Sequence, residues 1–191
     1  MKIIAWNCRG LGNGAAVRGL LGVQKEEDPD ILFLSETKMD ENRINGLRWK
    51  LGMANMVVKD CSPTRGGGLA LFWKRGIDVH VRGISRLYID AEVLEKDGFV
   101  WRFTGFYGEP DDKQLSWRAL RALNASRERP WLCMGDFNEI LSNCEKEGGH
   151  HTTKAVWTGL GRRWRSVTWL IWVLREILSH GEIIATPVLS M

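Results

Sequence analysis

Residues 2–10, Lys-Ile-Ile-Ala-Trp-Asn-Cys-Arg-Gly, decide the fold class, because a short apolar run leads directly into a polar loop that contains glycine. Such a run is typical of a buried strand that opens into a loop. Apolar side chains then recur at helical spacing from residue 17 to residue 27, and Asp28-Pro29-Asp30 ends this helix. A second apolar run follows at residues 31–34. The order strand, helix, strand predicts a β-α-β unit at the start of the chain.

The rest of the first 150 residues alternates in the same way around an antiparallel middle. Helices are predicted at residues 44–51 and 115–123, and further strands at residues 56–58, 69–73, 77–81, 87–94, 99–107 and 131–134. The Asp97-Gly98 pair between two of these strands is a strong hairpin signal. Helices alternating with strands, with antiparallel strands in the middle, predict an α/β sandwich with mixed sheets.

Polar side chains follow the ends of three predicted buried strands. They are Asn7, Glu36 and the pair Asp136 and Asn138. Taken singly, an Asn after a strand is usually a turn, and Asp-x-Asn is usually an Asx-turn. Together with Tyr107 they supply hard oxygen ligands for Mg²⁺, a group to orient water and donors for a phosphate. Because open α/β folds keep their sites at strand ends, we expect these residues to share one site.

Five motifs carry a family resemblance in this order along the chain. They are Trp-Asn-Cys-Arg-Gly-Leu-Gly at 6–12, Leu-Ser-Glu-Thr-Lys at 34–38, Gly-Gly-Gly-Leu-Ala at 66–70, Gly-Phe-Tyr-Gly at 105–108 and Gly-Asp-Phe-Asn-Glu-Ile-Leu at 135–141. Residues 1–151 thus resemble the endonuclease/exonuclease/phosphatase superfamily. The first and last motifs, with Glu-Lys-Glu-Gly-Gly at 145–149, resemble its plant LINE-type (non-LTR) retrotransposon branch. The resemblance implies an incomplete four-layer α/β sandwich with mixed sheets.

The resemblance also implies a role for each matching residue. Glu36 would be the metal ligand, with Mg²⁺ as the ion and Mn²⁺ as an alternative, and Asn7 would be a polar partner of metal and phosphate. Tyr107 would donate to the phosphate, Asp136 would orient or deprotonate the attacking water, and Asn138 would hold the phosphate from the opposite side. The implied activity is in-line hydrolytic nicking of DNA, which is the expected partner of an intact parent protein.

Two departures from the family pattern predict an inactive fragment. Arg9 stands where many members carry an acidic residue, so the metal would have one carboxylate less. The closing Ser-Asp-His element of the family, expected well beyond residue 151, does not occur in the chain. His150 and His151 do not replace it, because they follow a glycine pair and not a later strand.

Residues 152–191 differ in character from what precedes them. They hold five basic and two acidic residues, hence most of the net charge of +4, and four of the ten tryptophans. Two interpretations stay open: a frameshifted stretch that forms no domain, or a real amphipathic helix at residues 160–178. A non-enzymatic fragment that binds nucleic acid through this basic, Trp-rich tail is one alternative function. Another is a different phosphodiesterase or phosphatase of the same superfamily.

Cysteine spacing and hydropathy narrow the class of protein further. The four cysteines show no Cys-x-x-Cys spacing, so neither a zinc site nor a disulfide framework is predicted. Residues 66–68, three glycines, fit a tight turn better than a phosphate cradle, since no Gly-Lys-Ser/Thr follows. The sequence shows no signal peptide and no apolar run of about 20 residues. We therefore expect an intracellular protein without a membrane partner. The resemblance implies a nuclear location. The oligomeric state stays open.

Overall fold

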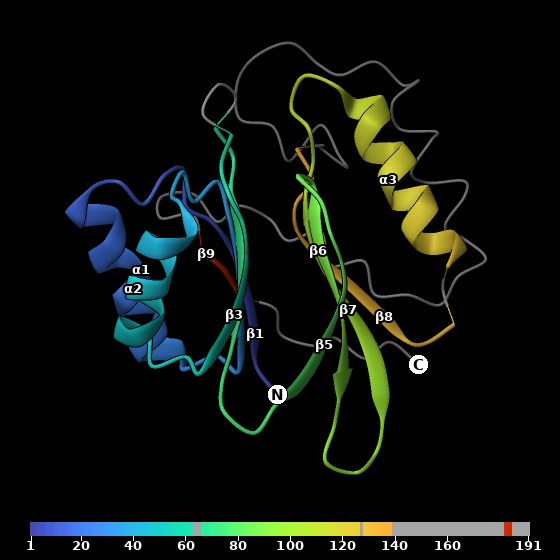
Figure 1. The fold of residues 1–191 in the computed structure, drawn as a ribbon, viewed down its shortest axis with the longest axis horizontal. Coiled ribbons are helices and arrows are strands. Elements are labelled where there is room, and N and C mark those ends of the chain that lie inside the picture. Colours follow the sequence, from blue (N-terminus) through green and yellow to red (C-terminus); the bar gives the residue numbers. More distant parts are fainter. Residues whose placement is uncertain (63–65, 127, 139–181, 185–191) are drawn as a thin grey trace.

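Two β-sheets face each other in the computed structural model, which describes residues 1–62, 66–126, 128–138 and 182–184. Helices α1 and α2 cover the outer face of the first sheet, and α3 covers the outer face of the second (Figure 1). The layers are therefore helix, sheet, sheet, helix. The predicted α/β sandwich is confirmed.

The first sheet has the strand order β3-β4-β2-β1-β9. Its strands are β1 (Ile3–Asn7), β2 (Ile31–Ser35), β3 (Asn55–Lys59), β4 (Leu69–Trp73) and β9 (Glu182–Ile184). β1 and β2 are parallel, with Asn7 opposite Ser35, whereas β4 is antiparallel to both β2 and β3. The short β9 is antiparallel to β1. The sheet is mixed because the helical crossover from β1 to β2 keeps that pair parallel.

The second sheet has the order β5-β6-β7-β8, with β5 (Asp78–Ile84), β6 (Tyr88–Leu94), β7 (Val100–Tyr107) and β8 (Trp131–Asp136). The predicted hairpin joins β6 to β7, and α3 (Lys113–Ala125) carries the chain from β7 to the parallel β8. In that parallel pair Tyr107 lies opposite Asp136. Each sheet thus brings two of the polar residues predicted for the site to the ends of neighbouring strands.

The helices begin at capping side chains. Asn13 caps α1 (Gly14–Glu27), Asp40 caps α2 (Glu41–Lys50) and Asp112 caps α3, each accepting a backbone N–H of the first turn. Each cap satisfies a donor that the helix itself leaves unpaired. The helix predicted from residue 17 therefore starts earlier, at Gly14. Within the described ranges, no helix is long and apolar enough to span a bilayer.

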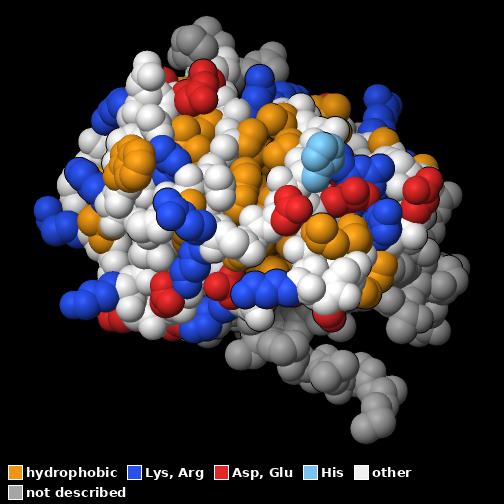
Figure 2. All heavy atoms as spheres, turned by 60° about the horizontal axis from the view of Figure 1, so that its bottom comes forward, with side chains coloured by type: hydrophobic (Ala, Val, Ile, Leu, Met, Phe, Trp, Pro, Cys, Tyr) orange, Lys and Arg blue, Asp and Glu red, His pale blue; other side chains and the backbone are white. Residues whose placement is uncertain are grey.

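The core between the sheets depends on close contact of aromatic rings. Phe33 of β2 meets Phe103 of β7 edge to face, with ring centroids 6.5 Å apart. A side chain at Gly105 would place its Cβ 2.2 Å from the Phe33 ring, so the sheets can approach this closely only over glycine. On the face that Figure 2 brings forward, hydrophobic side chains gather near the centre and charged ones surround them.

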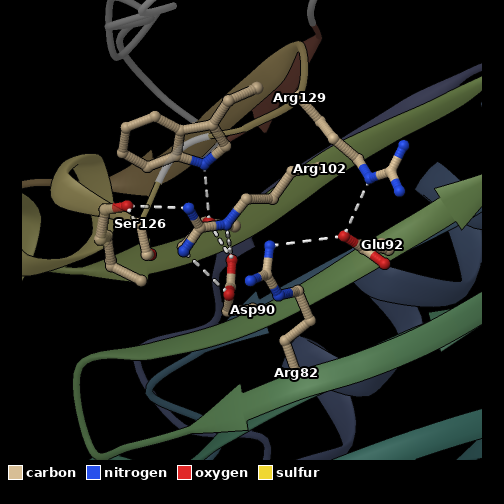
Figure 3. A network of polar contacts seen from close by, with 9 residues as sticks. Arg82, Asp90, Glu92, Arg102, Ser126 and Arg129 are labelled. Atoms are coloured by element: carbon tan, nitrogen blue, oxygen red, sulfur yellow. Dashed lines mark hydrogen bonds and ion pairs between the residues drawn. The ribbon is translucent and has the colours of Figure 1, made fainter.

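A buried ion pair crosses the outer face of the second sheet (Figure 3). Arg102 donates to Asp90 through Nε at 2.8 Å and Nη2 at 3.0 Å, and through Nη1 to the Leu123 carbonyl at 2.8 Å. Thr104 donates to the same carboxylate at 2.6 Å and accepts from the indole of Trp131 at 2.8 Å. These bonds tie β6, β7, β8 and α3 together. They fix the strand alignment that places Tyr107 beside Asp136.

Candidate active site at the facing strand ends

The four strands that carry the predicted residues end beside one another. Asn7 is the last residue of β1, and Glu36 follows β2 directly. The amide of Cys8 donates to the Ser35 carbonyl at 2.9 Å, so the β1–β2 pairing continues up to Glu36. Tyr107 and Asp136 close β7 and β8 of the facing sheet. The site therefore lies where the two sheets meet, at one end of the sandwich.

One amide joins the two sheets at this point. Asn7 Nδ2 donates to Glu36 Oε1 at 2.9 Å and to Asp136 Oδ2 at 2.8 Å. The hydroxyl of Tyr107 also donates to Glu36 Oε1, at 3.0 Å. The predicted grouping of Asn7, Glu36, Tyr107 and Asp136 is thus present, with a neutral amide between two half-buried carboxylates.

Asn138 is joined to the same cluster by hydrogen bonds that involve the backbone. Its N–H donates to Asp136 Oδ1 at 2.9 Å, which is the Asx-turn that the sequence also predicts. Its side-chain amide donates to the Gly108 carbonyl at 2.6 Å, and the Gly108 N–H donates to the Asp136 carbonyl at 2.7 Å. The turn and the site are therefore one structure, in which Asn138 fixes the carboxylate of Asp136.

Backbone strain is concentrated at these strand ends. Among the described residues, five other than glycine have positive φ, and four of them are Arg9, Glu36, Lys38 and Asn138, with φ between 48° and 51°. The left-handed region disfavours residues with a Cβ, and such outliers cluster at functional sites. Hydrogen bonds from Thr37 N to Gly68 O at 3.1 Å and from Lys38 N to Gly67 O at 2.9 Å hold the strained loop after β2.

The environment keeps Tyr107 and Cys8 protonated. Burial is the first cause that raises the pKa of the Tyr107 phenol, and its hydrogen bond to Glu36 is the second. Burial also raises the pKa of the Cys8 thiol, and the nearby charge of Glu36 adds to this. Tyr107 is therefore a neutral hydrogen-bond donor at physiological pH, and Cys8 is a packing residue and not a nucleophile.

The family profile of the Endonuclease/Exonuclease/phosphatase family matches residues 4–172, which include every residue of this site. The chain belongs to the endonuclease/exonuclease/phosphatase family. The match extends past residue 151, where we place the end of the partial domain, so the boundary of that domain stays a prediction. No curated protein sequence matches the chain significantly.

Solved structures of the endonuclease/exonuclease/phosphatase fold are similar to this chain at low identity. An AP endonuclease from Archaeoglobus fulgidus has a TM-score of 0.58 and 17% identity, over 78% of this chain and 61% of that one. The catalytic domain of human Nocturnin with bound sulfate has a TM-score of 0.52 and 18% identity, over 73% and 64%. A Bacteroides thetaiotaomicron mannosyl-6-phosphatase has a TM-score of 0.52 and 16% identity, over 72% and 65%. At this identity the likeness shows the fold alone, and the chain spans less than two thirds of each of these structures.

Members of this family generally depend on a divalent metal, and the donor set here fits a hard ion. The carboxylates of Glu36 and Asp136 are held by a shared donor, and Mg²⁺ usually takes one or two carboxylates and keeps several waters. In the described part of the chain, His, Cys, Asp and Glu side chains do not gather in threes as a metal cluster. The amide oxygen of Asn7 accepts the Arg9 N–H at 3.0 Å and so faces away from the carboxylates. Glu36 and Asp136 are therefore the two carboxylates here that could hold the ion.

Lys38 is the neighbour of the site that the sequence analysis missed. Its Nζ lies 3.6 Å from Glu36 Oε2. Its only signal in the sequence is a basic residue two positions after Glu36. Glu109, next to the Tyr107 motif, pairs with Arg86 at 2.7 Å.

The glycines at residues 66–68 precede β4, and the tight turn predicted for them stays a prediction, because residues 63–65 lie outside the described part of the chain. All three have positive φ, and Gly66 exchanges both backbone hydrogen bonds with Ser62. The predictions for His150, His151, the motif at residues 145–149 and the 160–178 helix lie outside the described residues.

Proposed function

We propose that this chain carries the metal-binding half of a phosphodiester hydrolase that acts on DNA, in the manner of a retrotransposon endonuclease of the plant LINE type. The supporting observation is the Asn7 amide that bridges Glu36 on one sheet and Asp136 on the other. Strand ends from both sheets therefore present acidic oxygens to one point. A nuclear location belongs to the proposal, because chromosomal DNA would be the substrate.

The attacking water would be bound and deprotonated at Asp136. Asp136 Oδ1 is fixed by the Asn138 N–H and Oδ2 by the Asn7 amide, so the carboxylate is held in one orientation before substrate arrives. A base held in this way needs little reorganisation when the water loses its proton. Asp136 would accept that proton as the oxygen attacks phosphorus, while the P–O bond to the sugar oxygen on the opposite side breaks and the released oxygen takes a proton from solvent.

Charge that develops on the phosphate would be met by neutral donors and by the ion. A Mg²⁺ or Mn²⁺ ion held by Glu36 would, when bound, polarise a phosphate oxygen. Tyr107 stays protonated because burial and Glu36 raise its pKa, so its hydroxyl would donate to a phosphate oxygen in exchange for its present bond to Glu36. The Asn138 amide would donate from the other side.

We expect the chain on its own to be nearly inactive, with only slow hydrolysis of DNA. The resemblance assigns a phosphate-stabilising histidine to a Ser-Asp-His element that the sequence does not contain. Loss of one donor to a transition-state oxyanion costs roughly 10²–10³ in rate. Ion binding at Glu36 does not need this donor, so binding and turnover give separate readouts.

The test measures Mn²⁺ binding and plasmid nicking with the purified full chain. We expect Mn²⁺ to bind the wild type and Glu36→Ala to lose that binding. Glu26→Ala, which removes an exposed glutamate of α1, is the matched control and should bind as the wild type does. Supercoiled plasmid with Mg²⁺ should be nicked slowly, and only by variants that retain Glu36.

Three outcomes would contradict parts of the proposal. Mn²⁺ binding that survives Glu36→Ala would remove Glu36 as the ligand. Fast nicking that depends on Glu36 would overturn the expected low activity. Hydrolysis of a phosphomonoester such as p-nitrophenyl phosphate, with no action on plasmid, would replace the endonuclease by a phosphatase of the same family.

A further inference from the structure

The two oxygens of Glu36 have different neighbours. Asn7 and Tyr107 both donate to Oε1, at 2.9 and 3.0 Å. The ammonium of Lys38 instead lies 3.6 Å from Oε2. Oε2 therefore faces a half-exposed positive charge, while Oε1 is fixed by neutral donors.

The stem of Lys38 passes along two glycines. A Cβ on Gly10 would lie 3.2 Å from Lys38 Cδ, and a Cβ on Gly66 would lie 4.0 Å from Lys38 Cε. The backbone of Lys38 is anchored by its N–H to Gly67 and has a φ of 51°. The backbone thus aims the side chain at Glu36, although 51% of that side chain is exposed. The ammonium can turn toward solvent without any movement of the strands.

The charges near Asn7 explain why a lysine suits this position. Glu36 and Asp136 bring two carboxylates to one neutral amide, and such a pair gains from a nearby positive charge. A divalent ion on Glu36 would repel the ammonium from the same oxygen, because like charges at this separation destabilise each other. Only one of the two cations can occupy Oε2.

We propose that Lys38 is the counter-cation of Glu36 in the metal-free site, and that it turns to a phosphate of the nucleic-acid strand once a divalent ion occupies Glu36. This inference rests on the proposed function. Lys38 is then a positioning residue with two opposed effects. Its charge weakens the binding of the ion and strengthens the binding of the strand.

The experiment compares Lys38→Gln with Lys38→Arg. Both variants keep a Cβ and an unbranched stem at the left-handed φ, and only Gln removes the charge. We expect Lys38→Gln to bind Mn²⁺ roughly two- to fivefold more tightly, the size of effect given by a partly exposed ion pair. Lys38→Arg should bind Mn²⁺ as the wild type does. Lys96→Gln removes the same charge from the β6–β7 turn, at the opposite end of β7 from Tyr107, and should change nothing.

Duplex binding is measured with Mn²⁺ present and in the Asp136→Asn background, so that the strand is not cut. Lys38→Gln should weaken binding of a short duplex and lower its salt dependence by about one phosphate contact. If Lys38 had a purely structural role, Lys38→Gln would weaken the binding of both Mn²⁺ and the duplex. Unchanged or weaker Mn²⁺ binding in Lys38→Gln, or unchanged duplex binding, would overturn the inference. Failure of the wild type to bind Mn²⁺ would instead overturn the proposed function.

Discussion

Replacing Arg102 by methionine should destabilise the fold far more than loss of a surface charge would. The side chains of Arg102 and Asp90 are only 2% and 5% exposed, and two hydrogen bonds join them at 2.8 and 3.0 Å. Arg102→Met leaves the Asp90 carboxylate buried with the Thr104 hydroxyl as a remaining donor, and it takes one of two side-chain donors from the Leu123 carbonyl, which keeps the Ser126 hydroxyl at 3.1 Å. An uncompensated buried charge of this kind costs about 3–5 kcal/mol.

A second variant separates the ion pair from its packing. Arg102→Met combined with Asp90→Leu removes both charges. Its remaining cost, about 1–3 kcal/mol, is that the Thr104 hydroxyl loses its acceptor and the Leu123 carbonyl loses one of two side-chain donors. The double variant should therefore be more stable than Arg102→Met alone. Urea unfolding followed by far-UV circular dichroism, extrapolated to water, gives each free energy of unfolding.

The same sheet offers a matched control. Arg82 pairs with Glu92 at 3.4 Å, with side chains 31% and 27% exposed (Figure 3). Arg82→Met should cost less than about 1 kcal/mol. The account of the buried pair is wrong if Arg102→Met lowers the free energy of unfolding no more than Arg82→Met does. It is also wrong if the double variant loses as much stability as the single variants Arg102→Met and Asp90→Leu lose together.

Two further predictions concern the end of β7. The pKa of Tyr107 is raised by burial and by Glu36, so phenol ionisation of the folded chain, followed by ultraviolet absorbance, should include a step above about pH 10 that Tyr107→Phe removes. Because the pKa of Tyr107 is higher in the folded state than in the unfolded chain, the phenol stabilises the fold at pH values below the ordinary tyrosine pKa. This stabilisation is lost as the pH rises through the folded-state pKa. Ionisation of Tyr107 at the ordinary tyrosine pKa would contradict the argument. Gly108→Ala would place its Cβ 2.0 Å from the Phe137 carbonyl oxygen and should lower the free energy of unfolding by about 1–3 kcal/mol. Gly22→Ala, inside α1 with nothing within 4 Å, should raise it by about 0.5–1 kcal/mol, and equal effects of the two would refute the steric argument.

Local periodicity predicted the element types well and the buried polar network not at all. In β7 the polar Arg102 and Thr104 alternate with the apolar Trp101 and Phe103, a pattern that by itself indicates a strand with one face in solvent. In the structure α3 covers that face, so both polar side chains are buried. Their importance comes from Asp90, which lies opposite Thr104 on β6.

The sequence by itself determined which strand ends carry polar groups, because a short apolar run that ends in Asn7, Glu36 or Asp136 is a local pattern. Only the tertiary structure decided how those groups face one another. Asn7 and Asp136 are 129 positions apart, and their 2.8 Å contact exists because the two sheets pack closely over Gly105. The position of Lys38 depends likewise on a left-handed backbone and on two glycines from separate loops. Contacts of this kind are set by packing between distant segments, which no local pattern encodes.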